Sequence, residues 1–267
     1  MLSILGLARF TGSASSEEMS ATLFTKVNVF DGASTKLHKG MSVLVDGGKI
    51  TAIGTGDLKV PKSATVIDGG GRTLMPGLID NHVHIFMMGS SEKDLMESAS
   101  DPSKLFATAA TEAKNMLFRG FTSVRDVGGP VFGTKRDIDS GKNMGPRIYP
   151  SGAYISQTSG HGDSRLLSEK SRRFGGKTSA AELIGIDFIA DGRDEVLTAV
   201  REDLRAGASQ IKVMAGGRAA SAYDPLDVTQ YTLDEMKAAV EAADDWNTYV
   251  TVHAYTPKPF GSPWKRA

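Results

Sequence analysis

The repeated succession of helix and strand patterns after residue 76 constrains the fold of this chain more than any other feature. Helical periodicity places apolar residues on one face of 103–119, 194–206 and 232–243, and a short apolar run follows each segment. Five strands are predicted, at 77–84, 121–127, 147–155, 210–215 and 249–255. Strands that alternate with helices run parallel and are joined by crossover connections. An open doubly wound sheet and a (β/α) barrel both fit this pattern.

The positions of polar residues favour the barrel. Such residues come late in the predicted strands: His82, His84, Arg125, Asp126, Lys212 and His253. The functional groups of a barrel gather at the C-terminal ends of its strands. A doubly wound nucleotide-binding protein would need a Gly-x-Gly-x-x-Gly turn before a helix, whereas the glycines at 69–71 lead into a strand. The predicted fold class is therefore α/β, a (β/α) TIM-like barrel with about five of its eight strands present.

Residues 21–73 have a different pattern, made of short strands and turns. Asp46-Gly47-Gly48 is a hairpin signal between two β-rich runs. We predict a small β-sandwich module, represented by its N-terminal half, over 21–73, followed by the partial barrel over 74–256. Residues 1–20 are predicted to be a disordered or spurious extension, and residues 257–267, which contain three prolines, an irregular tail.

The segment 76–84 carries the strongest chemical signal. It ends in Asp-Asn-His-Val-His, so that Asp80, His82 and His84 point to one face of a strand. Two imidazoles at adjacent inward positions can hold one metal ion, and Asp80 is placed to orient a ring nitrogen. The chain has only five histidines, which argues against an incidental pair.

Lys212 and His253 are candidate ligands on later strands. Lys212 is flanked by apolar residues and is predicted to point inward, where burial lowers the pKa of a lysine. Its neutral amine could then react with carbon dioxide to form a carbamate that bridges two metal ions. The alternative is a lysine with a buried stem and an exposed ammonium group. His253 alone fits a core histidine equally well.

Composition limits the partners and the kind of metal site. Cysteine is absent, so zinc would bind through histidine and oxygen ligands. Lysine and arginine balance aspartate and glutamate at 31 each, which gives no reason to expect nucleic acid or a membrane as partner. No apolar run approaches the roughly 20 residues of a membrane helix. We predict a cytoplasmic protein, with a secretory signal over residues 1–18 as the alternative.

Together these residues resemble the metal-dependent amidohydrolase superfamily, in particular its imidazolonepropionase-related and Xaa-Pro dipeptidase-like branch. The resemblance runs from about Leu23 to about Pro257. Its motifs lie at 74–84, 120–127, 156–163, 210–214 and 253–257.

The resemblance implies a metal centre and a reaction. His82 and His84 would bind the more buried metal, commonly zinc (Zn²⁺). Carboxylated Lys212 would bridge to a second metal held partly by His253. The implied reaction is hydrolysis of an amide or peptide-like C–N bond by a metal-activated hydroxide. A small-molecule or dipeptide substrate is expected, such as an Xaa-Pro dipeptide or an N-acyl amino acid, and homo-oligomerisation stays open.

Two further residues are candidates for substrate binding. His161 lies in a glycine-rich loop after the third predicted strand, where the resemblance puts a histidine close to the substrate. Tyr231 precedes the Thr232-x-x-Glu235 capping box, on the functional side of a barrel. The alternatives are a surface-loop histidine and a packing tyrosine.

The chain also departs from the family pattern. A further histidine on the sixth strand and the catalytic aspartate on the eighth have no counterpart before residue 267. The sequence therefore predicts a chain truncated after the fifth barrel strand, with no catalytic residue assigned and weak or absent hydrolysis. The alternative function is a truncated non-catalytic relative that retains at most metal binding.

Overall fold

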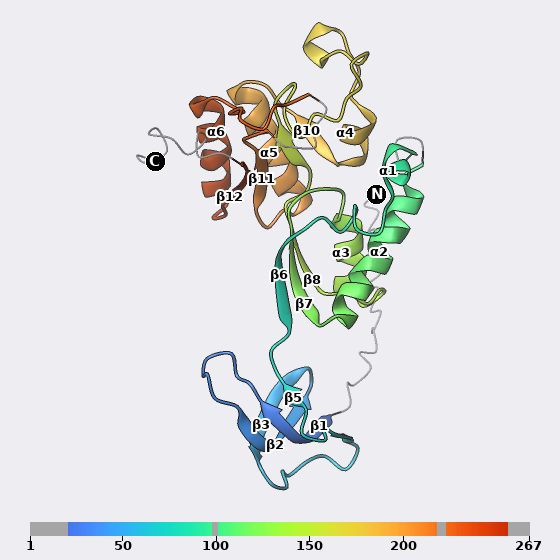
Figure 1. The fold of residues 1–267 in the computed structure, drawn as a ribbon, viewed down its shortest axis with the longest axis vertical. Helices are drawn as coiled ribbons and strands as arrows, with labels where there is room; N and C mark the ends of the chain where they lie inside the picture. The colour runs from blue at the N-terminus through green and yellow to red at the C-terminus, as the bar shows by residue number, and fades with distance from the viewer. Residues whose placement is uncertain (1–20, 98–100, 218–222, 256–267) are drawn as a thin grey trace, which may run out of the picture. The chain divides into compact units, whose positions relative to one another are not determined.

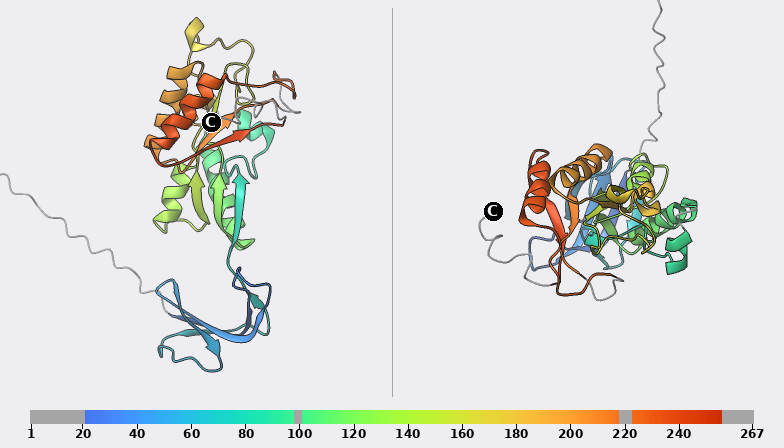
Figure 2. Two further views of the ribbon diagram at one scale, coloured as in Figure 1. Left: turned by 90° about the vertical axis from the view of Figure 1, so that its left-hand side faces the viewer. Right: turned by 90° about the horizontal axis from the view of Figure 1, so that it is seen from above.

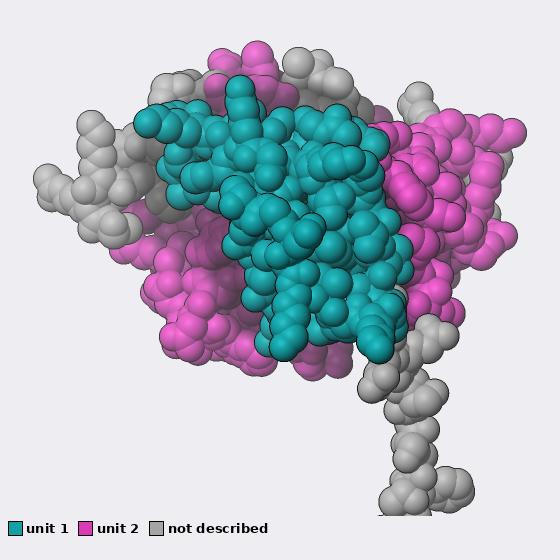
Figure 3. All heavy atoms as spheres, turned by 90° about the horizontal axis from the view of Figure 1, so that it is seen from below, with its two compact units in different colours: residues 1–76 teal, residues 77–267 magenta. Residues whose placement is uncertain are grey.

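The computed structural model describes residues 21–97, 101–217 and 223–255. The chain divides into two compact units, residues 1–76 and residues 77–267, which Figure 3 distinguishes by colour. The boundary lies at the turn that precedes the histidine-bearing strand. The sequence places the start of its barrel segment three residues earlier, at residue 74.

Unit 1 is a five-stranded sheet. Its strands are β1 (Thr22–Val29), β2 (His38–Asp46), β3 (Lys49–Thr55), β4 (Thr65–Asp68) and β5 (Thr73–Leu74). The order is β3-β2-β1-β4, and β5 also pairs with β1. Gly47 and Gly48, with φ of 57° and 73°, form the predicted hairpin turn between β2 and β3. A second sheet, which a sandwich needs, is not found among residues 21–76, so the sandwich stays a prediction.

The strands of unit 2 pair in parallel, as the helix–strand alternation predicts (Figure 1). One sheet contains β6 (Leu78–Val83), β7 (Phe121–Asp126) and β8 (Arg147–Pro150), in that order. The other has the order β10-β9-β11-β12, formed by β9 (Tyr154–Ser156), β10 (Asp187–Ile189), β11 (Ile211–Met214) and β12 (Val250–His253). The parallel α/β architecture is confirmed, whereas closure into a barrel stays a prediction.

Helices separate these strands along the chain. They are α1 (Glu92–Glu97), α2 (Ser103–Phe118), α3 (Phe132–Asp139), the 3₁₀ turn η1 (Arg172–Phe174), α4 (Ala180–Ile184), α5 (Arg193–Ala206) and α6 (Leu233–Asp244). Helix α6 begins at the predicted capping box. Gly120 and Gly207 follow α2 and α5 with φ of 95° and 105°, a conformation that favours glycine at the end of a helix. No helix in the described ranges has the length and apolar character needed to cross a membrane.

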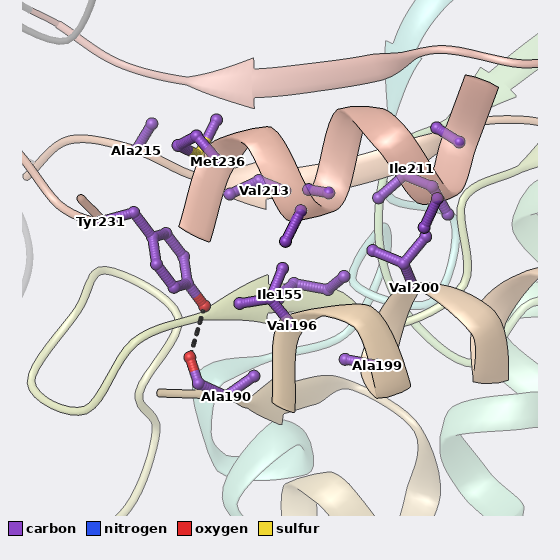
Figure 4. Close-up of a cluster of buried hydrophobic side chains, with 14 of the residues drawn as sticks. Ile155, Ala190, Val196, Ala199, Val200, Ile211, Val213, Ala215, Tyr231 and Met236 are labelled. Carbon is purple, nitrogen blue, oxygen red and sulfur yellow. Dashed lines mark hydrogen bonds between the residues drawn. The ribbon is translucent and has the colours of Figure 1, made fainter. Parts of the chain in front are cut away.

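Each sheet of unit 2 has its own apolar core. Helices α5 and α6 lie side by side and cover β9 and β11, with Ile155, Val200, Val213 and Met236 buried between them (Figure 4). Helix α2 lies beside the other sheet (Figure 2). Val83, Val124 and Ile148 of that sheet are buried in one cluster with residues of α2. Burying such side chains contributes about 1.5–3 kcal/mol each. The strands that carry the candidate ligands therefore lie on well-packed supports.

The structure differs from the expected elements in several places. The predicted strand at 147–155 is interrupted, because Asp203 Oδ1 accepts the Ala153 N–H at 3.0 Å and Gly152 takes a φ of 80°. Strand β10 and helices α1, α3 and α4 were not predicted. The glycine-rich loop predicted after the third strand is followed by η1 and α4 before β10 begins. The predictions for 1–20 and 257–267 fall outside the described residues.

Candidate metal centre

His82 and His84 lie at the end of β6 and just beyond it. Their rings are 5.5 Å apart between centroids and meet edge to face. His82 is exposed and His84 is half-buried. Asp80 does not orient a ring nitrogen as expected, because its Oδ1 accepts the backbone N–H of His82 at 3.1 Å. The carboxylate therefore stabilises the strand end instead of an imidazole.

The ring of His84 is oriented by a backbone carbonyl. Its Nδ1 lies 3.2 Å from Gly128 O, and a proton on Nδ1 leaves the lone pair on Nε2. Burial lowers the pKa of His84 to about 4, and the nearby charges of Lys212, His82 and His253 act in the same direction. The imidazole is consequently neutral at pH 7, which is the state that binds metal. An N–H donated to a carbonyl is also the usual outer contact of a metal-binding histidine.

Asp126 connects His84 to Gly128. Its Oδ2 accepts the N–H of Ile85 at 2.8 Å, and its Oδ1 accepts the N–H of Gly128 at 3.2 Å. The carboxyl group is fully buried, and burial raises its pKa to about 7. Gly128 has a φ of 150°, and a Cβ there would lie 2.7 Å from the ring of Tyr154. These contacts fix the loop that orients His84.

Lys212 and His253 lie on neighbouring parallel strands. In their register Lys212 is opposite Thr251 and Met214 is opposite His253, so Lys212 and His253 project from the same face. Lys212 is only 2% exposed, which confirms its predicted inward orientation. It is the second residue of β11 and not a late one, so its long side chain must reach along the strand toward His253.

The predicted metal centre depends on the lysine as a ligand. Within the described ranges, no three His, Cys, Asp or Glu side chains lie close enough together to hold a metal ion. The charges of Lys212, His82 and His253 all act on the pKa of His84, but the assembly of these four residues into one ligand set stays a prediction. The three histidines supply nitrogen ligands only. Lys212 would add oxygen ligands if its amine were carboxylated to a carbamate.

His161 joins this group from the loop after β9. Its ring stacks on His253 with centroids 4.3 Å apart. Its backbone N–H donates to Gln230 Oε1 at 2.9 Å, and its Nδ1 lies 3.9 Å from Asp224 Oδ2. The histidine is therefore not a free surface-loop residue. Asp224 and Gln230 had no role in the sequence-based prediction.

Tyr231 has the contacts of a packing residue. Its side chain is buried in the core beneath α5 and α6, and its hydroxyl donates to Ala190 O at 3.0 Å (Figure 4). Its backbone N–H donates to Gln157 Oε1 at 2.5 Å. The predicted substrate contact stays a prediction, and these contacts favour the alternative of a packing tyrosine.

A cavity of about 600 Å³ lies elsewhere in unit 2. Its walls come from α2, α3 and α5, with Phe106, Phe132 and Asp203 among the lining residues. None of the predicted ligands lines it, so the histidine-rich strand ends and this cavity are separate features.

The loop that bears His161 gives an expected pH dependence of stability. Ser164 Oγ donates to Asp187 Oδ2 at 2.5 Å, and burial raises the pKa of Asp187 to about 7, above the ordinary 3.8. Between about pH 4 and 7 the folded protein holds a proton that the unfolded chain has lost, so the free energy of unfolding falls as pH rises. We expect Asp187→Asn to reduce this slope by up to about 1.4 kcal/mol per pH unit.

Urea denaturation at pH 5, 6 and 7 measures this slope. The slope that remains in the variant combines opposite contributions, because the raised pKa of Asp126 and of Asp203 makes stability fall with pH, whereas the lowered pKa of His84 makes it rise. Equal slopes in wild type and Asp187→Asn would contradict the assignment of this proton to Asp187.

Comparison with known proteins identifies the family. Residues 73–262 match the model of the Amidohydrolase family. The ochratoxinase of Aspergillus niger is 33% identical over 250 residues, which are 91% of this chain and 52% of that protein. The crystal structure of a prolidase complexed with N-methylphosphonate-L-proline is 36% identical with a TM-score of 0.81, covering 92% of this chain and 59% of that one. A Xaa-Pro dipeptidase with bound methionine is 30% identical with a TM-score of 0.72, covering 90% and 58%.

The chain spans about half the length of the curated ochratoxinase that it matches. The matched segment includes all of the histidine- and lysine-bearing strands described above. The chain belongs to the amidohydrolase family.

Proposed function

We propose that this protein hydrolyses a C–N bond of a small substrate at a metal centre formed by His82, His84, Lys212 and His253. The observation that carries the proposal is the burial of Lys212, at 2% exposure, on the same face as His253 and beside the neutral imidazole of His84. A lysine is costly to bury as a cation, so its position calls for a chemical role.

That role follows from the state of the amine. Burial, and to a lesser extent the positive charge of Arg125, lowers the pKa of Lys212 to about 8. The neutral amine attacks carbon dioxide, a C–N bond forms, and one proton is released to solvent. The resulting carbamate is an anionic ligand with two oxygens, which converts a repulsive buried charge into a metal ligand.

The other residues of the site hold the donors in place. His84 offers Nε2 because its Nδ1 proton is directed to Gly128 O, and Asp126 fixes that loop through two backbone N–H groups. Arg125 Nε donates to Asn81 O at 2.7 Å, next to His82. Divalent metal, when bound, supplies the Lewis acidity that activates water and polarises a carbonyl.

The substrate proposal draws on the relatives. An ochratoxinase, a prolidase and a Xaa-Pro dipeptidase each match about nine-tenths of this chain. Xaa-Pro dipeptides and N-acyl amino acids are therefore the first substrates to assay. The second candidate is a non-catalytic relative that binds metal only, since the proposed ligand set of three histidines and one lysine contains no carboxylate to carry a proton.

Carbon-13 NMR with labelled bicarbonate tests the lysine chemistry directly. In zinc-loaded protein we expect one carbamate signal, absent from Lys212→Arg, which keeps a buried cation but has no nucleophilic amine. The same samples are assayed for release of proline and of free amino acid. A signal with hydrolysis supports the proposed enzyme, a signal without hydrolysis supports the metal-binding alternative, and no signal with zinc present contradicts the assignment of Lys212.

A further inference from the structure

Asp224 lies within ion-pair distance of the His161 ring, though beyond hydrogen-bond distance, and it holds the side chain that binds the His161 backbone. Asp224 Oδ2 accepts a hydrogen bond from Gln230 Nε2 at 2.8 Å, and the same oxygen lies 3.9 Å from His161 Nδ1. Gln230 in turn accepts the His161 N–H on Oε1 at 2.9 Å. The carboxylate of Asp224 therefore lies near the imidazole of His161 and, through Gln230, also holds the backbone of His161.

The carboxylate of Asp224 is deeply buried, where a group with only a structural contact would be costly. The side chain of Asp224 is 1% exposed and that of His161 is 10% exposed. The ion pairs of the described residues give Asp224 no lysine or arginine partner, and its Oδ1 has no hydrogen bond. A buried anion is expensive without a donor or positive charge beside it. The imidazole of His161 is the ionisable group that faces it.

The segment that supplies Gln230 is itself tied to the lysine-bearing strand. The N–H of Gln230 donates to Ala215 O at 3.0 Å, one residue beyond β11. A reciprocal contact runs the other way, from the N–H of Tyr231 to Gln157 Oε1 at 2.5 Å. Two glutamines thus join the His161 loop to the end of β11, which gives His161 a fixed position against His253.

We infer that Asp224 is a positioning residue, which together with Gln230 holds His161 with its proton on Nδ1. The Nε2 lone pair is then presented, beside His253, to an N–H or O–H group of a bound ligand. A role for this arrangement in hydrolysis rests on the proposed function. The position of the proton on His161 Nδ1 is independent of it.

Nitrogen-15 NMR of histidine-labelled protein, without metal and at constant pH, tests the inference. The chain has five histidines, so a single His161→Asn spectrum assigns the ring signals of His161. In wild type we expect the proton on Nδ1. In Asp224→Asn the negative charge is lost while the size is kept, and the ratio of Nδ1–H to Nε2–H should fall roughly two- to threefold, less than the loss of a full charged hydrogen bond would give, because the two atoms are 3.9 Å apart.

Asp203→Asn is the matched control. Asp203 is also a buried aspartate with one backbone hydrogen bond, and it lies outside this network, so its substitution should leave the His161 signals unchanged. Gln230→Met provides a second route if Asp224→Asn does not fold, and it should shift the backbone amide signal of His161. A wild-type ring protonated on Nε2 alone, or identical ratios in wild type and Asp224→Asn, would overturn the inference. Because no metal is used, a failure of zinc binding or hydrolysis leaves this result standing.

Discussion

A chain in which His82 and His84 are both replaced by alanine is expected to lose zinc, whereas the wild-type chain should carry it in near-stoichiometric amount. The two imidazoles lie on one strand end with ring centroids 5.5 Å apart, and His84 is already neutral at pH 7 because its pKa is lowered to about 4. Binding therefore costs no deprotonation at His84. We expect the affinity to fall by more than about 100-fold, since the loss of outer contacts alone costs 10–100-fold.

Elemental analysis of purified protein, followed by competition with a chelator, measures this loss. His38→Ala is the matched control, because His38 lies in unit 1 and pairs with Asp31 at 3.5 Å on the surface. The control should retain zinc. Equal zinc in the double variant and the wild type would show that these histidines are not ligands, and absence of zinc from folded wild type would favour a chain that does not assemble the centre.

Local sequence signals predict the regular elements of this chain well. The His-x-His strand, the strands near 121, 211 and 250, and the helices that begin near 103, 193 and 233 all appear within one or two residues of their predicted ends. Glycines after helices and the capping box at Thr232 carry a physical preference that depends on few neighbours. The parallel pairing then follows from the order of helices and strands.

Contacts between distant residues explain what the sequence did not predict. The break at 151–153 depends on Asp203, fifty residues later, which accepts the Ala153 N–H in place of a strand partner. Asp224 meets His161 only through the fold, and no spacing in the sequence marks the pair. Lys212 and His253 could be predicted to share a face because side chains alternate along a strand, but the carbonyl of Gly128 that orients His84 could not.

Asp126→Ala is expected to destabilise unit 2 more than other single substitutions near the site. The carboxyl group is fully buried and accepts two backbone N–H groups, from Ile85 at 2.8 Å and from Gly128 at 3.2 Å. Alanine would leave both donors buried without an acceptor, at about 1–3 kcal/mol each, partly offset by removal of a buried acid. We expect a net loss of about 2–4 kcal/mol in the free energy of unfolding.

Urea denaturation followed by tryptophan fluorescence measures this loss in the correct unit, because Trp246 belongs to unit 2 and residues 1–76 contain no tryptophan. Asp126→Asn keeps one carbonyl oxygen as an acceptor and should lose about half as much. Asp139→Ala, which removes an exposed carboxylate paired with Lys135, should change stability by less than about 0.5 kcal/mol. If Asp126→Ala behaves like Asp139→Ala, the two N–H groups have other acceptors. If the loss is as expected, zinc affinity should fall with it, because the same loop orients His84.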